Sequence, residues 1–239
     1  MLMRALVHAN SHVKHKTTKS VLSLKTYLPT KIGPLDRLLG GGLPSSDVLI
    51  VAGEIGTGKS IFAEQICFTA LSLGYDVLLE CLDKKPDEVL AHMRSFGWDA
   101  SPFLKRSFTL TDMVNRTGIA DELMQNVVKF CEGKLGRHLL VVTDSISAVK
   151  GSESRRRVIE TFRDRTSLLK SVGAFGLVIA HGSVSQGEIS DTLRGIFDGL
   201  LHVALSEGKL TIQHIFLEGG QSQARPISIK ITTNGIQTA

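Results

Sequence analysis

A glycine-rich segment that ends in a lysine and a serine is the part of this sequence whose residue types and spacing could do chemistry. Residues 53–60 match the pattern G-x-x-x-x-G-K-[ST]. The backbone N–H groups of such a loop converge on phosphate oxygens at the positive end of a helix. We therefore expect a phosphate-binding loop made of Gly53, Glu54, Ile55, Gly56, Thr57, Gly58, Lys59 and Ser60 and continued by Ile61.

Two side chains of this loop have distinct expected roles. The ammonium group of Lys59 can reach the β- and γ-phosphates of a nucleotide, and the hydroxyl group of Ser60 can coordinate Mg²⁺. A second metal ligand is expected at the end of a neighbouring apolar strand, where Asp144 follows residues 139–143. These residues predict that ATP and Mg²⁺ bind together, with Ser60 and Asp144 as the metal ligands.

The elements around the motif have the order that a phosphate-binding loop requires, which is strand, loop, helix. Residues 48–52 form a continuous apolar run, as in a parallel strand that is buried on both faces. Apolar residues then recur at near-helical spacing from Ile61 to Leu73, so this helix is expected to bury one face. Further strands are predicted at 77–82, 108–110, 139–142 and 175–180, and further helices at 87–96, 122–131 and 156–172.

This alternation indicates an α/β fold, because strand, helix and strand in sequence form parallel pairs with right-handed crossovers. After Asp198 the pattern changes to strands joined by tight turns, with turn signals at 207–208 and 218–220. We predict a parallel sheet flanked by helices, with a small antiparallel extension at its C-terminal end. Residues 30–239 are expected to form one domain.

Positive charge is concentrated at the start of the chain. The net charge is +5, but residues 1–31 hold six basic residues and no acidic one, which leaves 22 of the 28 basic residues against all 23 acidic ones. Residues 1–29 are expected to be a flexible basic tail, and nucleic-acid binding is expected through this tail alone, if at all.

Composition also limits the location of the protein. No apolar run approaches the roughly 20 residues that span a bilayer, so no transmembrane segment is predicted. The start of the sequence lacks the apolar stretch of a secretory signal, and the three cysteines have no CxxC spacing. These features favour a cytoplasmic protein with reduced thiols.

Over residues 30–236 the chain resembles the KaiC-like branch of the RecA superfamily of P-loop ATPases. The resemblance implies a RecA-like ATPase core, of a kind found in many archaeal proteins and frequently assembled in rings with nucleotide at subunit interfaces. A homo-oligomer or a partner protein is therefore expected. The region of His181 and residues 191–205 also looks like the ATP-binding subunit of the archaeal swimming motor. Besides the phosphate-binding loop, the resemblance rests on residues 30–36, LLGGGLP at 38–44, RSFGWD at 94–99, DSIS at 144–147 and FDG at 197–199.

Two departures from the family pattern concern hydrolysis. The family usually carries a Glu-Glu pair whose first Glu activates the attacking water, and this chain has Asp83 and Lys84 there. Asp83, the expected catalytic base, is one methylene shorter than Glu, and Lys84 can pair with it and make it a poorer base. Glu80 is not expected to replace it, because three residues along a strand span about 10 Å. The family's C-terminal Lys-x-Arg finger is also missing, since residues 215–218 read IFLE.

Two further features have open or structural interpretations. His181 follows a buried strand, where RecA-like proteins keep a polar residue that senses the γ-phosphate, and it is either such a sensor or a plain loop residue. An arginine cluster is expected to form a solvated or interfacial helix face with Glu160 as a partner. Its members are Arg155, Arg156, Arg157, Arg163 and Arg165.

Three functions are open on the sequence. The preferred one is a regulatory or assembly protein that binds ATP and Mg²⁺ and hydrolyses ATP slowly or not at all. The second is an active ATPase that uses Asp83 as its base. The third is a recombinase-like ATPase that binds single-stranded DNA, which is disfavoured because residues 32–239 carry a net charge of −1 and aromatic residues make up only 5% of the chain.

Overall fold

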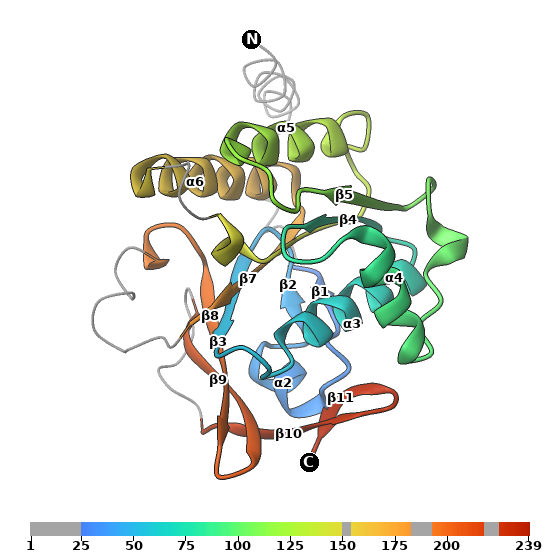
Figure 1. The fold of residues 1–239 in the computed structure, drawn as a ribbon, viewed down its shortest axis with the longest axis vertical. Coiled ribbons are helices and arrows are strands. Elements are labelled where there is room, and N and C mark those ends of the chain that lie inside the picture. The colour runs from blue at the N-terminus through green and yellow to red at the C-terminus, as the bar shows by residue number, and fades with distance from the viewer. Residues whose placement is uncertain (1–24, 150–153, 183–192, 218–224) are drawn as a thin grey trace, which may run out of the picture.

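A nine-stranded mixed sheet organises the computed structural model, which describes residues 25–149, 154–182, 193–217 and 225–239 (Figure 1). The strand order is β11-β10-β9-β8-β3-β7-β6-β4-β5. Six neighbouring strands are parallel, and their bounds are β3 (Val48–Gly53), β4 (Asp76–Cys81), β5 (Phe108–Asp112), β6 (Leu139–Asp144), β7 (Phe175–His181) and β8 (Gly199–Ser206).

The antiparallel extension follows β8 at one edge of this sheet. Strand β8 turns back into β9 (Lys209–Leu217) at Glu207-Gly208, where both residues have positive φ angles. Strands β10 (Ile227–Thr232) and β11 (Gly235–Thr238) complete the edge. The predicted parallel sheet with an antiparallel C-terminal extension is confirmed, whereas the turn expected at 218–220 lies outside the described residues.

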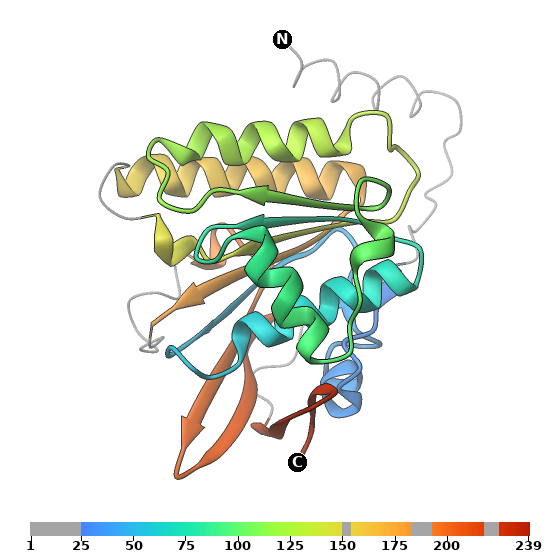
Figure 2. The same cartoon turned by 45° about the vertical axis from the view of Figure 1, so that its right-hand side comes forward.

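Helices cover both faces of the sheet (Figure 2). Helices α3 (Lys59–Ser72) and α4 (Pro86–Ser95) lie on one face, and α5 (Ile119–Cys131) and α6 (Arg155–Val172) lie on the other. The central strand β3 contributes to an apolar core on each face of the sheet. Leu49 and Val51 pack on the side of α3, and Ile50 packs on the side of α5 and α6. Because β3 is buried on both faces, its sequence is apolar throughout. None of the described helices combines the length and the apolarity that a membrane span requires.

Helix α3 is buried over most of its surface, so the expectation of one buried face was wrong. Strands β4 and β6 lie beneath the helix, and α4 and β11 contact it from other directions. Gln65 is the tie between these parts: its amide group donates to Thr30 O at 3.0 Å and Ile236 O at 3.2 Å, and it accepts from Ile236 N at 2.7 Å. Leu73, which the helical spacing placed on the buried face, is 51% exposed.

The folded part begins earlier than expected. A short strand, β1 (Tyr27–Leu28), pairs with β2 (Leu43–Pro44). Helix α2 (Gly33–Leu38) connects the two strands in the sequence. Leu28 is fully buried, and Lys25 forms an ion pair with Asp47 at 3.0 Å. Residues 25–29 of the expected tail are therefore part of the fold, and residues 1–24 lie outside the described residues.

A buried ion pair joins α6 to two of the parallel strands. Arg165 donates through both terminal nitrogens to the carboxylate of Glu80, at 2.5 and 3.1 Å, and Thr143 Oγ1 donates to the same carboxylate at 2.7 Å. Both charged side chains are at most 3% exposed. The expected solvated arginine face holds for the exposed residues Arg155, Arg156, Arg157 and Arg163, among which Arg156 pairs with Glu160. It was wrong for Arg165.

We predict that Arg165→Met lowers the free energy of unfolding by about 3–5 kcal/mol, because the substitution leaves the Glu80 carboxylate buried without a cation. The measurement is urea unfolding followed by circular dichroism. Arg156→Met is the matched control, since its pair with Glu160 is exposed to solvent and should contribute little to stability. Equal losses in the two variants would show that the Arg165–Glu80 pair does not hold the fold together.

Candidate functional site

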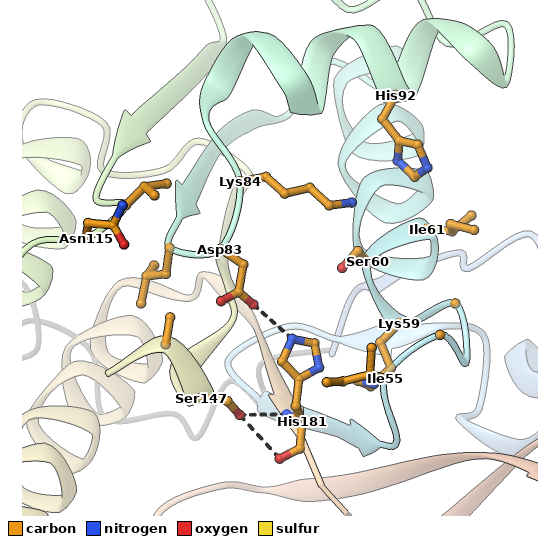
Figure 3. A pocket seen from close by; sticks show the side chains of 15 residues that line it. Ile55, Lys59, Ser60, Ile61, Asp83, Lys84, His92, Asn115, Ser147 and His181 are labelled. Atoms are coloured by element: carbon orange, nitrogen blue, oxygen red, sulfur yellow. Dashed lines mark hydrogen bonds and ion pairs between the residues drawn. The ribbon is translucent and has the colours of Figure 1, made fainter. Parts of the chain in front are cut away.

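The parallel register brings the expected site residues to one edge of the sheet. Gly53 at the end of β3 lies opposite His181 at the end of β7, and Asp144 at the end of β6 lies opposite Cys81 at the end of β4. A cavity of about 720 Å³ opens at this edge (Figure 3). Most of the residues expected to bind nucleotide, metal or water line the cavity: Ile55, Gly56, Gly58, Lys59, Ser60, Ile61, Asp83 and His181. The others, Gly53, Glu54, Thr57 and Asp144, are not part of its lining.

At two positions of the loop, glycine is required by close packing against neighbouring strands as well as by phosphate binding. Gly53 has a φ angle of 156°, and a Cβ atom there would lie 2.0 Å from Val203 O of the neighbouring strand β8. Gly58 has a φ angle of 88° at the start of α3, and a Cβ atom there would lie 2.9 Å from Ile231 Cδ1 of the C-terminal hairpin. The loop therefore packs tightly against β8 and the C-terminal hairpin, while other residues of the loop line the cavity.

Lys59 is held against the loop that it belongs to. Its side chain donates to Glu54 O at 2.6 Å and to Thr57 Oγ1 at 3.4 Å, and the residue is 3% exposed. Burial lowers the pKa of Lys59, while the negative charge of Asp144 acts in the opposite direction. A phosphate group that displaced the carbonyl oxygen would give this ammonium a charged acceptor in place of a neutral one, which is a stronger hydrogen bond.

Asp144 and Ser60 form an oxygen pair that suits Mg²⁺. Within the described part of the chain, the buried Oδ1 atom of Asp144 has no hydrogen-bond partner. Burial raises the pKa of Asp144, and a hydrogen bond with the Ser60 side chain acts against that rise. Carboxylate and hydroxyl oxygens are ligands that Mg²⁺ accepts together with phosphate oxygens and water. These two residues would hold the ion, which when bound neutralises phosphate charge.

Asp83 is engaged by two side chains other than the expected one. Its Oδ2 atom accepts from Ser145 Oγ at 2.5 Å. The same atom lies 2.9 Å from His181 Nε2 (Figure 3). Lys84 points away from it, so the expected Asp83–Lys84 pair was wrong. His181 is fixed in turn, because its backbone N–H group donates to Ser147 Oγ at 2.7 Å. The buried Nδ1 atom of His181 has no partner among the described residues.

A buried acid beside the cavity was missed from the sequence. Glu64 lies one helical turn after Ser60 on α3, is 2% exposed, and contacts His92 Nδ1 at 2.6 Å through its Oε2 atom. Burial raises the pKa of Glu64 to about 8 and lowers the pKa of His92. One signal was available: an acid four residues after Ser60 lies on the same helix face, toward the metal site.

The strand order, the loop and the residues at the strand ends define a RecA-like P-loop nucleotide-binding protein. Residues 28–237 match the family of ATPases described as KaiC, so the chain belongs to the KaiC family. The expected resemblance is thereby confirmed.

Individual relatives agree with this membership. A UPF0273 protein of Thermotoga maritima is 34% identical over 235 residues, which cover 87% of this chain and 93% of the relative. A UPF0273 protein of Aeropyrum pernix is 27% identical over 231 residues, which cover 87% and 91%. The crystal structure of a KaiC-like protein from Pyrococcus horikoshii superposes with a TM-score of 0.73 over 90% of this chain and 99% of that chain. Because the two sequences are only 20% identical, this match shows a shared fold and says nothing about a shared function.

Lys59→Ala should abolish tight ATP binding, because it removes the ammonium that the loop aims at the β- and γ-phosphates. Calorimetric titration with Mg·ATP measures the effect, and a thermal unfolding scan checks that the variant is folded. Lys85→Ala is the control, since it removes an exposed lysine that does not line the cavity. An unchanged dissociation constant in Lys59→Ala would contradict the phosphate site.

Asp144→Asn should weaken the dependence of ATP binding on Mg²⁺, because it removes a metal-facing charge and keeps the side-chain shape. We expect the Mg²⁺ concentration for half-maximal stimulation to rise about tenfold, as for the loss of one charged contact. Titration of Mg²⁺ at fixed ATP gives this value. A variant that responds to Mg²⁺ as the wild type does would exclude Asp144 as a metal ligand.

Proposed function

We propose that this protein binds ATP with Mg²⁺ as a regulatory or assembly protein of the cytoplasm, and that it hydrolyses ATP slowly or not at all. The observation that carries the proposal is the state of Asp83. The Oδ2 atom of this carboxylate already faces a serine hydroxyl and a histidine nitrogen. A general base must accept a proton from an oriented water, and that step typically contributes about 10²- to 10⁴-fold to a rate.

The residues around the N-terminus of α3 support ATP as the ligand. Lys59, the hydroxyl group of Ser60 and the Oδ1 atom of Asp144 lie together at the N-terminus of α3, where the helix dipole favours phosphate. That oxygen has no hydrogen-bond partner in the part of the chain that the structure describes. The cavity of about 720 Å³ lies in the range of small-molecule sites. We assign Gly53 to Ile61 and His181 to the nucleotide, and Ser60 and Asp144 to the metal.

The segment that would carry a trans-acting finger supports slow turnover. Residues 215–217 belong to β9, and Phe216 is 7% exposed within the core on the α5 and α6 side. A strand residue that packs inward cannot reach a neighbouring subunit's phosphate. An arginine finger is worth about 10³- to 10⁵-fold in rate, so its absence from this segment favours binding over hydrolysis.

The assembly part of the proposal rests on the resemblance to RecA-like ATPases that form rings. Ile55 is 82% exposed at the edge of the cavity, and a single exposed apolar side chain is ordinary at a protein surface. The cytoplasmic location is supported by three buried thiols, Cys67, Cys81 and Cys131, none of which forms a disulfide.

An active ATPase is the second candidate, because Asp83 lines the same cavity as Lys59 and His181. The recombinase-like candidate has less support. Stacking on single-stranded DNA needs accessible rings. The rings of Phe68, Phe96 and Trp98 instead stack on one another against the core beside α3.

Asp83→Glu tests the proposal, because it restores the missing methylene without changing the charge. We expect wild-type turnover on the order of one event per minute or slower, and faster phosphate release by the variant at similar ATP affinity. Asp83→Asn is the matched control, which should not exceed the wild type. A slower Asp83→Glu variant would mean that the catalytic carboxylate lies elsewhere. A wild type that turns over many times per second would establish the active ATPase instead.

A further inference from the structure

Lys84 places a second ammonium group in the cavity. It follows Asp83 after the end of β4, is half-buried, and lines the cavity together with Lys59 and Ser60. Figure 3 shows its side chain extending across the cavity toward Ser60 at the start of α3, with His92 above it. Lys84 therefore approaches the phosphate site from the side opposite to the loop.

Lys84 is not part of an ion pair among the described residues at the cavity. The ion pairs of the described residues at the cavity join His181 to Asp83 and His92 to Glu64, and none of them includes Lys84. Its positive charge acts on the carboxyl groups of Glu64 and Asp144, lowering the pKa of each. The carboxyl group of Glu64 contacts His92 instead, at 2.6 Å.

The position of this cation matches the terminal phosphate of a nucleoside triphosphate. The loop, Lys59 and the N-terminus of α3 would hold the β- and γ-phosphates of a bound triphosphate. The outer side of the γ-phosphate would then face the strand ends that carry Asp83 and His181, and a diphosphate would lack this group. A lysine is suited to such a contact, because its ammonium group is a compact point charge on a flexible stem.

We propose that Lys84 is a ligand of the γ-phosphate and makes the site selective for nucleoside triphosphates over diphosphates. This inference rests on the proposed ATP site and adds to it a residue that distinguishes the two nucleotides. Lys59 contributes to the binding of both nucleotides, whereas Lys84 contributes to ATP alone. Any protein that recognises the ATP-bound state would then depend on Lys84 for the difference between the two states.

The test compares the dissociation constants of Mg·ATP and Mg·ADP for three proteins: the wild type, Lys84→Gln and the control Lys85→Gln. Lys85 is the exposed neighbour, carries the same charge and does not line the cavity. Lys84→Gln should weaken ATP binding about tenfold or more, as expected for the loss of a contact between charged groups. Its ADP affinity should change less than about twofold, and the control should change neither affinity.

Lys84→Arg keeps the cation and should retain most of the ATP preference, which separates the role of the charge from any effect on folding. Equal changes in ATP and ADP affinity in Lys84→Gln, or no change in either, would overturn the role of Lys84 and leave the proposed nucleotide binding intact. Loss of the ATP preference in Lys84→Arg as complete as in Lys84→Gln would also count against it. A wild type that binds neither nucleotide would overturn the proposed function and this inference with it.

Discussion

The parallel pairing of β3 with β7, β7 with β6 and β6 with β4 is the constraint on which the candidate site depends. Because these strands run in the same direction, their carboxyl ends meet at one edge, and ligands of open α/β sheets bind outside that edge. The buried cluster of Arg165, Glu80 and Thr143 joins strands β4 and β6 to helix α6 near these strand ends. Glu80 lies three residues before Asp83, and Thr143 directly precedes Asp144, so one guanidinium group holds the ends of two site-bearing strands in register.

Sequence patterns predicted the parts of this arrangement that depend on local order. The apolar run of β3 and the glycine loop are continuous in the chain, so their context was visible without the fold. Contacts between distant segments were not visible. Arg165 looks like one more charge on an arginine-rich helix, because its partner Glu80 lies 85 residues away. Asp83 was paired with its neighbour Lys84, whereas the fold brings His181 to it from a separate strand.

In the proposed site, the residues that would bind ATP and metal differ from the residue that would activate water for hydrolysis. Lys59, Ser60 and Asp144 lie where phosphate and metal would bind. Lys59 donates to a neutral carbonyl group, and the Oδ1 atom of Asp144 has no hydrogen-bond partner among the described residues, so a ligand could satisfy both better than the protein does. Asp83, by contrast, already has two partners. Preorganised contacts of the first kind lower the free energy of the bound ground state, whereas turnover needs contacts that strengthen in the transition state. This difference is the physical basis of the slow hydrolysis that we propose.

The fate of ATP bound by the unmodified protein tests the central claim most directly. Protein in excess over radiolabelled Mg·ATP would be quenched with acid after intervals from one second to one hour, and ATP and ADP would be separated and counted. The account predicts that the nucleotide is bound and that most of it is still ATP after a time on the order of one minute. Complete conversion to ADP within the first second, or no bound nucleotide at all, would contradict it.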